Sequence, residues 1–383
     1  MSNSSPIDTH NPTDTAQPWD VPGWIPDKPG ACDYGYVSAG NAVGCDREEL
    51  LKEFAARGPA GIKFVWTPET PTPVFPEKVP LLLEGFKRIA VRSARNNLLL
   101  GFGLIGFGLV LALLWQDWRF LYLNIFSIFG ALAIVEGSWQ FIRSRHYTQE
   151  EAEADAIGLR FDAWIRNKKI SGYTFGLAAF IVAVGIFQII TDPARSIEAA
   201  GLVKHAVWEG QAWRLLTACL MHGSFMHFWF NFLALLHFSR ITEQTLGRAY
   251  VPLVFLLSGA LGSVFSVLLY PNSTSVGASG GLMGLLGFIT VGAYLDRKTF
   301  PPKYLRNSIE GIAMVGVFGL FGFAFIDNAA HVGGLCGGLI LGWLLLKPYN
   351  QVSDKKKIES ILGLTALGIL GLIAFMAIIK IWG

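Results

Sequence analysis

The sequence predicts an all-α, polytopic membrane protein, and three observations support this fold class. Of the 383 residues, 52% are hydrophobic and 15% are charged, whereas soluble domains carry about 25% charged residues. Nine segments approach the roughly 20 apolar residues that a bilayer-spanning helix needs. Basic residues gather in alternate loops between these segments. The expected spans are residues 98–115, 120–139, 172–190, 220–239, 251–270, 277–294, 309–326, 329–346 and 361–379.

Composition excludes several other classes of protein. The net charge of +3 is too small to indicate nucleic-acid binding, so no nucleic-acid partner is expected. The four cysteines, Cys32, Cys45, Cys219 and Cys336, show neither metal-ligand spacing nor a disulfide framework, and no metal site is predicted. The first twenty residues contain three aspartates and no apolar run, which excludes a cleaved secretory signal and argues against a transit peptide.

The chain before the first span holds a tail and a small module. Residues 1–30 are rich in Ser, Thr, Pro and Asp, which predicts a disordered tail. Asp46 and Glu49 have the spacing of a capping box that begins a helix, and Gly58 can end that helix. Residues 61–66 have the pattern of a strand. The sequence indicates no partner for this module.

A charged stretch at residues 148–169 separates the second and third spans. Thr148 and Glu151 form a second capping box, and apolar residues recur after them at helical spacing. This pattern predicts an amphipathic helix, which either lies at the membrane surface or is a solvated linker helix. The residues favour neither alternative.

Basic residues near the span ends predict the orientation. One cluster at residues 87–95 precedes the first span, and another at 143–169 separates the second and third. The loops at 271–276 and 327–330, on the opposite side, contain no Lys or Arg. We therefore expect a cytosolic N-terminus and an outer C-terminus, in the cell (inner) membrane of a bacterium.

Polar side chains inside a membrane are costly, so each one needs a reason. Ser279 and His331 each begin a span that enters from outside, and His227 and Asn231 lie in the outer half of another. His227 and Asn231 are four residues apart and share a helix face. His222 would lie about 140° around that helix from His227, so we expect it to face elsewhere.

Glycines recur around Ser279 and His331 at the small-xxx-small spacing that lets helix backbones approach closely in lipid. Close approach would allow His331 to act as the base that activates the Ser279 hydroxyl. The Ser279 backbone N–H, the Asn231 amide and the His227 ring could then stabilise an oxyanion. Asp327 is not clearly directed at His331, so we predict a dyad rather than a triad.

Each motif has another interpretation when it is taken alone. A Gly-x-Ser-Gly sequence in a membrane helix usually reflects packing, and a histidine at a helix start usually caps the helix or lies at the interface. The catalytic hypothesis depends on the combination of four polar residues at one depth.

This combination resembles the rhomboid intramembrane serine proteases. Trp213-Arg214 is similar to a pair in the family's first loop, and Glu243 is similar to its glutamate at the next turn. Both assignments are structural, as are those of His222 and the signature glycines. Three signatures occur in the family's order: His222-x4-His227-x3-Asn231, then Gly277-Ala278-Ser279-Gly280, then Ala330-His331-x2-Gly334-x3-Gly338.

The resemblance implies a Ser279–His331 dyad, no cofactor, and cleavage of transmembrane-helix substrates near their extracytoplasmic end. The implied partners are membrane-protein substrates and the lipid bilayer. Met283 departs from the pattern, because many members have an aromatic residue four positions after the serine. The resemblance also divides the chain into a disordered tail (1–30), a small cytosolic module and linker (31–97), an extra transmembrane hairpin (98–139), a cytosolic amphipathic linker (140–171), a six-helix rhomboid core (172–347), and a linker with one extra C-terminal helix (348–383).

Two other hypotheses remain. A catalytically inactive rhomboid-like protein would bind membrane helices without cleaving them, although such proteins normally lose the serine or the histidine. A transporter or channel is the alternative from another class, but the sequence shows neither paired acids within the spans nor an inverted repeat of broken helices. A cleavage assay distinguishes all three hypotheses.

Overall fold

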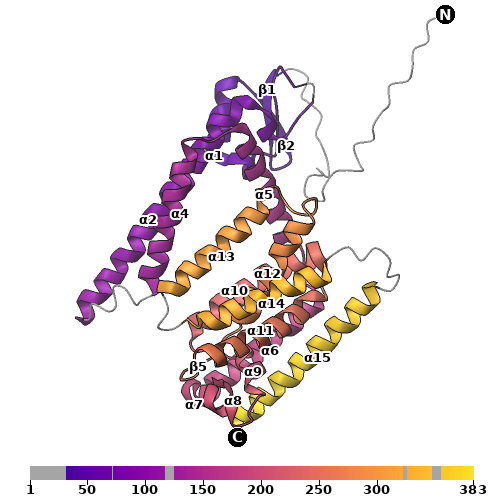
Figure 1. The fold of residues 1–383 in the computed structure, drawn as a ribbon. Helices are drawn as coiled ribbons and strands as arrows, with labels where there is room; N and C mark the ends of the chain where they lie inside the picture. Colours follow the sequence, from indigo (N-terminus) through magenta and orange to yellow (C-terminus); the bar gives the residue numbers. More distant parts are fainter. Residues whose placement is uncertain (1–31, 71, 117–124, 322–325, 347–354) are drawn as a thin grey trace, which may run out of the picture. The chain divides into compact units, whose positions relative to one another are not determined.

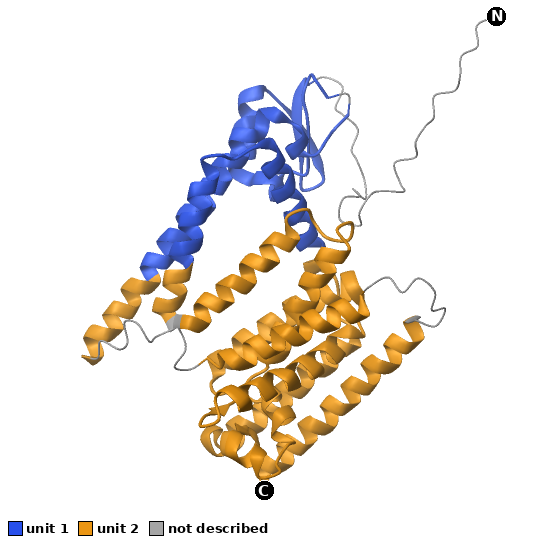
Figure 2. Cartoon of the chain, viewed as in Figure 1, with its two compact units in different colours: residues 1–103, 133–164 blue, residues 104–132, 165–383 orange. Residues whose placement is uncertain are grey.

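The computed structural model describes residues 32–70, 72–116, 125–321, 326–346 and 355–383. The chain forms two compact units (Figure 2). Unit 1 contains residues 1–103 and 133–164, and unit 2 contains residues 104–132 and 165–383. The predicted tail lies outside the described residues.

Unit 1 contains a three-stranded antiparallel sheet in the order β2-β1-β3. Its strands are β1 (Tyr34–Ser38), β2 (Asn41–Cys45) and β3 (Phe64–Trp66). Ala39 and Gly40 join β1 to β2 with φ angles of 50° and 85°. Positive φ at both loop residues is typical of the type I′ turn, whose twist matches that of a hairpin. The sequence analysis did not predict this hairpin.

The helix α1 (Arg47–Gly61) follows the sheet's second strand and confirms the first predicted capping box. The Glu49 backbone N–H donates to Asp46 Oδ1 at 2.8 Å. Gly58, with φ of 61°, interrupts the helix instead of ending it, and one further turn continues to Gly61. The strand predicted at residues 61–66 is confirmed as the shorter β3.

The helix α5 (Gln149–Asn167) confirms the second capping box. Glu151 N donates to Thr148 Oγ1 at 3.3 Å, and Thr148 N donates back to the Glu151 carboxylate at 3.4 Å. Ala152 and Ala156 are buried in the hydrophobic core of unit 1. This face of α5 therefore packs within unit 1, and the two expected alternatives, a surface-lying and a solvated helix, stay predictions for its other face.

Ion pairs fasten α5 to the segment before the first span. Glu77 is 1% exposed and pairs with Arg160, and Lys78 Nζ lies 3.2 Å from the Glu153 carboxylate. The apolar contacts and these pairs explain why the helix belongs to unit 1. The remaining elements of this part are η1 (Pro76–Lys78), η2 (Pro80–Leu82), α2 (Leu83–Trp115) and α4 (Ile125–Ser144).

Every predicted span overlaps a helix, which confirms the all-α fold class of the membrane part (Figure 1). Besides α2 and α4, these helices are α6 (Gly172–Thr191), α10 (Phe225–Thr242), α11 (Tyr250–Leu269), α12 (Ser279–Leu295), α13 (Tyr304–Phe321), α14 (Asn328–Leu345) and α15 (Lys355–Trp382).

Within the described residues, five helices are long and apolar enough to cross a membrane. A sixth span results if the bent pair of segments Arg214–Leu220 and Phe225–Gly247, which meet at 89°, is counted as one. α12 is apolar but shorter. The protein is therefore polytopic, and the total of nine spans stays a prediction.

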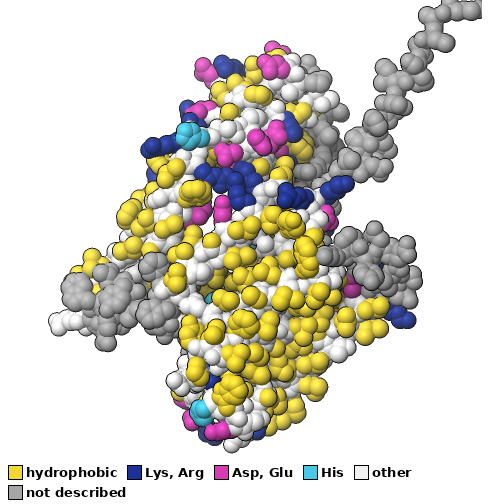
Figure 3. Space-filling model, viewed as in Figure 1, with side chains coloured by type: hydrophobic (Ala, Val, Ile, Leu, Met, Phe, Trp, Pro, Cys, Tyr) yellow, Lys and Arg dark blue, Asp and Glu magenta, His cyan; other side chains and the backbone are white. Residues whose placement is uncertain are grey.

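Unit 2 has its core where α11, α12 and α14 pack together and α15 packs along α6 (Figure 1). Leu177, Phe255, Phe288 and Leu370 come from four of these helices and are fully or almost fully buried. Hydrophobic side chains also cover the outer face of unit 2 that Figure 3 shows, as expected of a surface in contact with lipid.

The connection between α6 and α10 is built from several short elements. They are α7 (Pro193–Ala200), β4 (Leu202–Val203), α8 (Lys204–Trp208), α9 (Arg214–Thr217) and η3 (Ala218–Leu220). The π-helix η4 (Glu243–Gly247) follows α10, and β5 (Thr274–Ser275) precedes α12 and pairs with β4.

Candidate active site

Ser279 is the first residue of α12, and a glycine turn delivers it there. Gly277 has φ of 138°, a conformation that side chains rarely allow, and its N–H donates to the Ala218 carbonyl at 2.9 Å. A Cβ on Gly277 would lie 2.9 Å from His227 Nε2 and 3.7 Å from Ser279 Oγ. The turn therefore brings the His227 ring next to the serine.

The helices that carry Ser279 and His331 touch through their backbones. A Cβ on Gly334 of α14 would collide with the Gly280 carbonyl of α12, and the Ala330 carbonyl faces Gly280 from the other side of the contact. Gly280 follows Ser279, and Ala330 precedes His331. The glycine spacing predicted this close approach of the two helices, which carry the two candidate dyad residues.

A second glycine pair extends this contact along the helices. A Cβ on Gly338 would collide with the Gly284 carbonyl, and one on Gly284 would collide with the Ser258 side chain of α11. Four residues separate Gly334 from Gly338, so the same face of α14 meets α12 on successive turns. The close approach therefore extends over at least one full turn.

His227 and Asn231 share one face of α10, as predicted. Asn231 is 7% exposed, and its Nδ2 donates to the His227 carbonyl at 2.8 Å. The Gly223 backbone N–H donates to His227 Nδ1 at 3.5 Å. A neutral imidazole that accepts at Nδ1 carries its proton on Nε2, so the ring can donate a hydrogen bond toward Gly277 and the serine turn.

The expected position of His222 is wrong. α10 begins at Phe225, where Ser224 caps it by accepting from His227 N at 3.2 Å, so His222 precedes the helix. Its buried ring contacts that of His227, with centroids 5.2 Å apart and an interplanar angle of 74°. The 140° separation does not apply, because the angle per residue holds only within one helix.

A residue that the sequence analysis missed fixes the backbone of His222. Gln188, which is 3% exposed on α6, donates from Nε2 to the His222 carbonyl at 3.0 Å and accepts from the His222 N–H at 3.0 Å. A polar residue inside an apolar span was the available signal.

Arg214 organises the loop before α10. Its Nη1 donates to the carbonyls of Glu198 at 3.0 Å and Gly201 at 2.8 Å, and its Nε donates to Gln211 at 2.8 Å. The guanidinium also lies 4.6 Å from the centre of the Trp213 ring. These contacts shape the loop that leads into β4, the strand that pairs with β5 before Ser279.

Glu243 acts at the start of α6. Its carboxylate accepts from the Ser171 N–H at 2.9 Å, from Ser171 Oγ at 2.5 Å, and from Thr174 Oγ1. A negative charge at a helix N-terminus is favourable, because unpaired N–H groups and the helix dipole meet there. Glu243 therefore ties the end of α10 to the beginning of α6.

A buried ion pair, also missed, lies in front of α14. Lys204 is 0% exposed, and its Nζ lies 3.6 Å from Asp327 Oδ2 and 2.6 Å from Ser273 Oγ. Asp327 caps α14 by accepting from the Ala330 N–H at 2.9 Å, and it also accepts from Ser275 Oγ at 2.5 Å and from Ser266 Oγ. Its carboxylate oxygens are thus engaged by Ser266, Ser275, the Ala330 N–H and Lys204.

The surroundings shift the pKa values of both charged groups in this ion pair. Burial lowers the pKa of Lys204, and the Asp327 carboxylate counteracts that effect. Burial raises the pKa of Asp327, but the hydrogen bonds from Ser266, Ser275 and Ala330 and the charge of Lys204 together hold it below its ordinary value.

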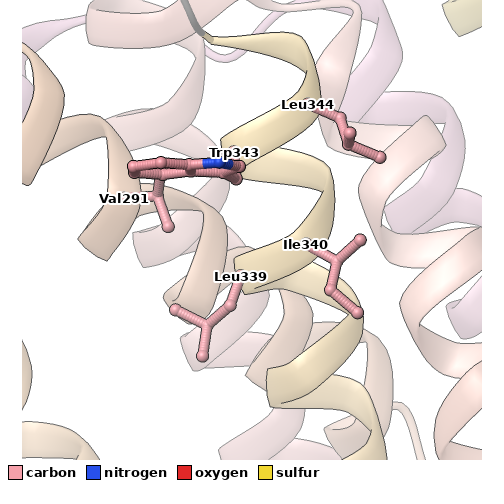
Figure 4. A pocket seen from close by; sticks show the side chains of 5 residues that line it. All are labelled: Val291, Leu339, Ile340, Trp343 and Leu344. Atoms are coloured by element: carbon pink, nitrogen blue, oxygen red, sulfur yellow. The ribbon is translucent and has the colours of Figure 1, made fainter.

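An apolar groove lies on α12 and α14, and it offers no group for catalysis (Figure 4). Its lining residues are Val291, Leu339, Ile340, Trp343 and Leu344. In the described part of the chain, no group of three or more His, Cys, Asp or Glu side chains could hold a metal ion.

Comparison with known proteins finds relatives of this region. A family model described as a Rhomboid domain matches residues 209–348, which include both candidate dyad residues. The chain is 36% identical over 141 residues to RHOMBOID-like protein 7 of Arabidopsis thaliana. It is 35% identical over 157 residues to Rhomboid protease GluP of Bacillus subtilis, and 30% identical over 142 residues to the rhomboid relative YdcA of the same bacterium.

These matches cover 37%, 40% and 37% of this chain. They cover 45% of the plant protein, 30% of GluP and 71% of YdcA. The chain therefore spans less than half the length of the first two relatives and most of the third.

Proposed function

Because this chain belongs to the rhomboid family, we propose that it is an intramembrane serine endopeptidase with Ser279 as nucleophile and His331 as base. Its substrates are membrane proteins with a transmembrane helix, cut near the extracytoplasmic end. The supporting observation is the backbone contact of Gly280 with Gly334, the close helix approach that a Ser279–His331 dyad requires. No cofactor takes part in the proposed reaction.

In the proposed reaction, His331 takes the proton of the Ser279 hydroxyl as Oγ attacks the scissile carbonyl carbon. The carbonyl oxygen becomes an oxyanion, which the Ser279 N–H, the Asn231 amide and the His227 ring stabilise. His331 then gives its proton to the leaving amine as the C–N bond breaks. Water, deprotonated by His331, hydrolyses the acyl-enzyme and regenerates the serine.

We further propose that the N-terminus is cytosolic and that the protein resides in the cell inner membrane of a bacterium. The alternation of basic loops supports the orientation. The bacterial relatives GluP and YdcA support the bacterial membrane, and the plant relatives show that the family also occurs elsewhere.

The test is cleavage of a fluorescently labelled single-span membrane protein by the purified full chain in proteoliposomes. We expect the wild type to release one main pair of fragments, and Ser279→Ala and His331→Ala to release none while their melting temperatures stay close to the wild type. Mass spectrometry of the fragments locates the cut relative to the bilayer.

Two matched substitutions control for the loss of a serine or a histidine elsewhere. Ser239→Ala removes a buried hydroxyl from α10 that has no hydrogen-bond partner in the described residues, and His146→Ala removes an exposed imidazole from unit 1. Both controls should cleave at the wild-type rate. Wild-type protein that binds the substrate without cutting it would favour the inactive rhomboid-like alternative.

A further inference from the structure

We propose that the ion pair of the buried Lys204 with the partly exposed Asp327 positions the dyad, by holding the loop that leads into Ser279 against the first turn of the helix that carries His331. The proposal rests on the proposed proteolytic function. Lys204 and Asp327 are positioning residues in this account, because neither touches the reacting atoms.

The pair connects the two chain segments that precede the dyad residues. Ser275, which donates to Asp327 at 2.5 Å, stands four residues before Ser279. Asp327 stands four residues before His331, and its carbonyl accepts from the His331 N–H at 3.1 Å. One carboxylate therefore contacts the serine's loop and begins the histidine's helix.

Lys204 connects a third segment, the end of β4 and the start of α8, to Asp327 and the serine loop. It directly follows β4, which pairs with β5 through Leu202 with Ser275 and Val203 with Thr274. Its ammonium contacts Ser273 as well as Asp327. The serine loop is thus held on one side by strand pairing and on the other by the ion pair.

The burial of Lys204 gives this arrangement its specificity. A charge out of water is costly unless it is paired, and removing one partner leaves the other uncompensated. In the described residues Ser273 and Asp327 satisfy the Lys204 ammonium, which also lies 5.7 Å from the centre of the Tyr270 ring. A displacement of 1 Å in an active site can lower a rate by roughly 10². Contacts that hold the serine loop in one position would therefore support the proposed reaction.

Two substitutions remove the charges with little change of shape. Asp327→Asn keeps an N-cap side chain for α14, since Asn caps as well as Asp, and leaves Lys204 buried and unpaired. Lys204→Met keeps an unbranched side chain of similar length. We expect each single variant to lower kcat by about 10- to 100-fold with KM within about threefold of the wild type.

The double variant tests whether the loss of kcat comes from one uncompensated charge or from the loss of either side chain. With no buried charge left over, Lys204→Met with Asp327→Asn should have a higher kcat than Asp327→Asn alone. The matched control is the exposed pair of Arg306 and Glu310 on α13, whose atoms also lie 3.6 Å apart. Arg306→Met and Glu310→Gln should cleave at the wild-type rate.

Hydrogen–deuterium exchange of the full chain in lipid nanodiscs provides a readout that does not depend on activity. In Asp327→Asn, exchange should rise in the peptides covering residues 270–279 and 327–333. Unchanged exchange in both peptides would overturn the proposal, and so would a lowered melting temperature with wild-type kcat per folded molecule. If the wild type cleaved nothing, the proposed protease would fail, whereas exchange would still show whether the pair holds both segments.

Discussion

Asn231 would serve both its own helix and the proposed reaction. One N–H of its amide already donates to the His227 carbonyl at 2.8 Å, one turn earlier on α10. This bond fixes the rotamer, so the second N–H keeps a constant direction without further loss of side-chain entropy. A fixed donor is what stabilisation of a developing oxyanion requires.

The first prediction concerns this donor. Asn231→Ala should lower kcat by about 10² to 10³ and leave KM nearly unchanged, because the oxyanion exists only in the transition state. Steady-state kinetics on the purified variant measure both constants, with the exposed Asn96→Ala as control. Full activity of Asn231→Ala would remove it from the oxyanion site.

The second prediction concerns His222. Its ring nitrogens are buried, have no hydrogen-bond partner in the described residues, and lie edge-on to His227. His222→Ala should lower the melting temperature, since cavity-forming substitutions cost about 2–5 kcal/mol, and it should also lower kcat because His227 loses its support. His222→Phe fills the space and should restore most of the stability. An unchanged melting temperature in His222→Ala would contradict this packing role.

Sequence spacing could predict which polar residues share a face only within single helices. The shared face of His227 and Asn231 was predicted correctly, because both lie on α10. The position of His222 was not, although Gly223 and Ser224 just before Phe225 are a helix-start signal that limits the spacing rule. The Lys204–Asp327 pair joins residues far apart in the chain, and no local pattern reveals such a contact.

At the scale of elements, the contact between α12 and α14 depends on glycines, which have no side chain to keep the two helices apart. Gly334→Ala should push the two helices apart, because its Cβ would collide with the Gly280 carbonyl. We expect a lower melting temperature and at least a 10²-fold loss of kcat, in line with a displacement of about 1 Å.

Gly311→Ala on α13 is the matched control for that third prediction. Nothing lies within 4 Å of its Cβ position. Alanine favours a helix over glycine by about 1 kcal/mol, so this variant should be as stable as the wild type or slightly more so. If Gly334→Ala behaved like Gly311→Ala, the helices could not be in backbone contact.

The fourth prediction concerns pH and the start of α14. The pKa of Asp327 lies below its ordinary value of about 3.9. A lowered folded-state pKa stabilises the protein fully above the unfolded-state pKa, and the contribution is lost as the pH falls through the folded-state pKa. The wild-type melting temperature should therefore fall below about pH 4 more steeply than that of Asp327→Asn. Equal slopes in melting curves from pH 2 to 6 would contradict the contribution of Asp327.

The membrane helices were predictable from apolar length, whereas the β1–β2 hairpin and the packing partner of α5 were not. The β1–β2 hairpin has only five residues in each strand and a two-residue turn of Ala39 and Gly40. Its outer strand is largely exposed, so it lacks the alternation that identifies a strand. The apolar face of α5 was visible in the sequence, but its partner, the core of unit 1, was not.

At the scale of the whole molecule, orientation yields the fifth prediction. With an odd number of spans, a tag at residue 1 should be protected from protease in sealed right-side-out vesicles, and a tag at residue 383 should be cut. The warrant is the alternation of basic loops. Both tags on one side would mean an even number of spans. In that case α4 or α13 would not cross the membrane, since neither is among the five helices of the described residues that are long and apolar enough to do so.

The contact between α12 and α14 has a consequence for the timing of catalysis. The backbones of α12 and α14 meet at Gly280 and Gly334, so no side chain lies between them at this point. Rotation of a side chain therefore cannot widen this helix contact. In the proposed protease, entry of a substrate would therefore come from movement of other helices, while α12 with Ser279 and α14 with His331 would move together. Admission and bond-breaking then have separate barriers, so a substitution that loosens a lipid-facing helix could speed the first step without altering the second.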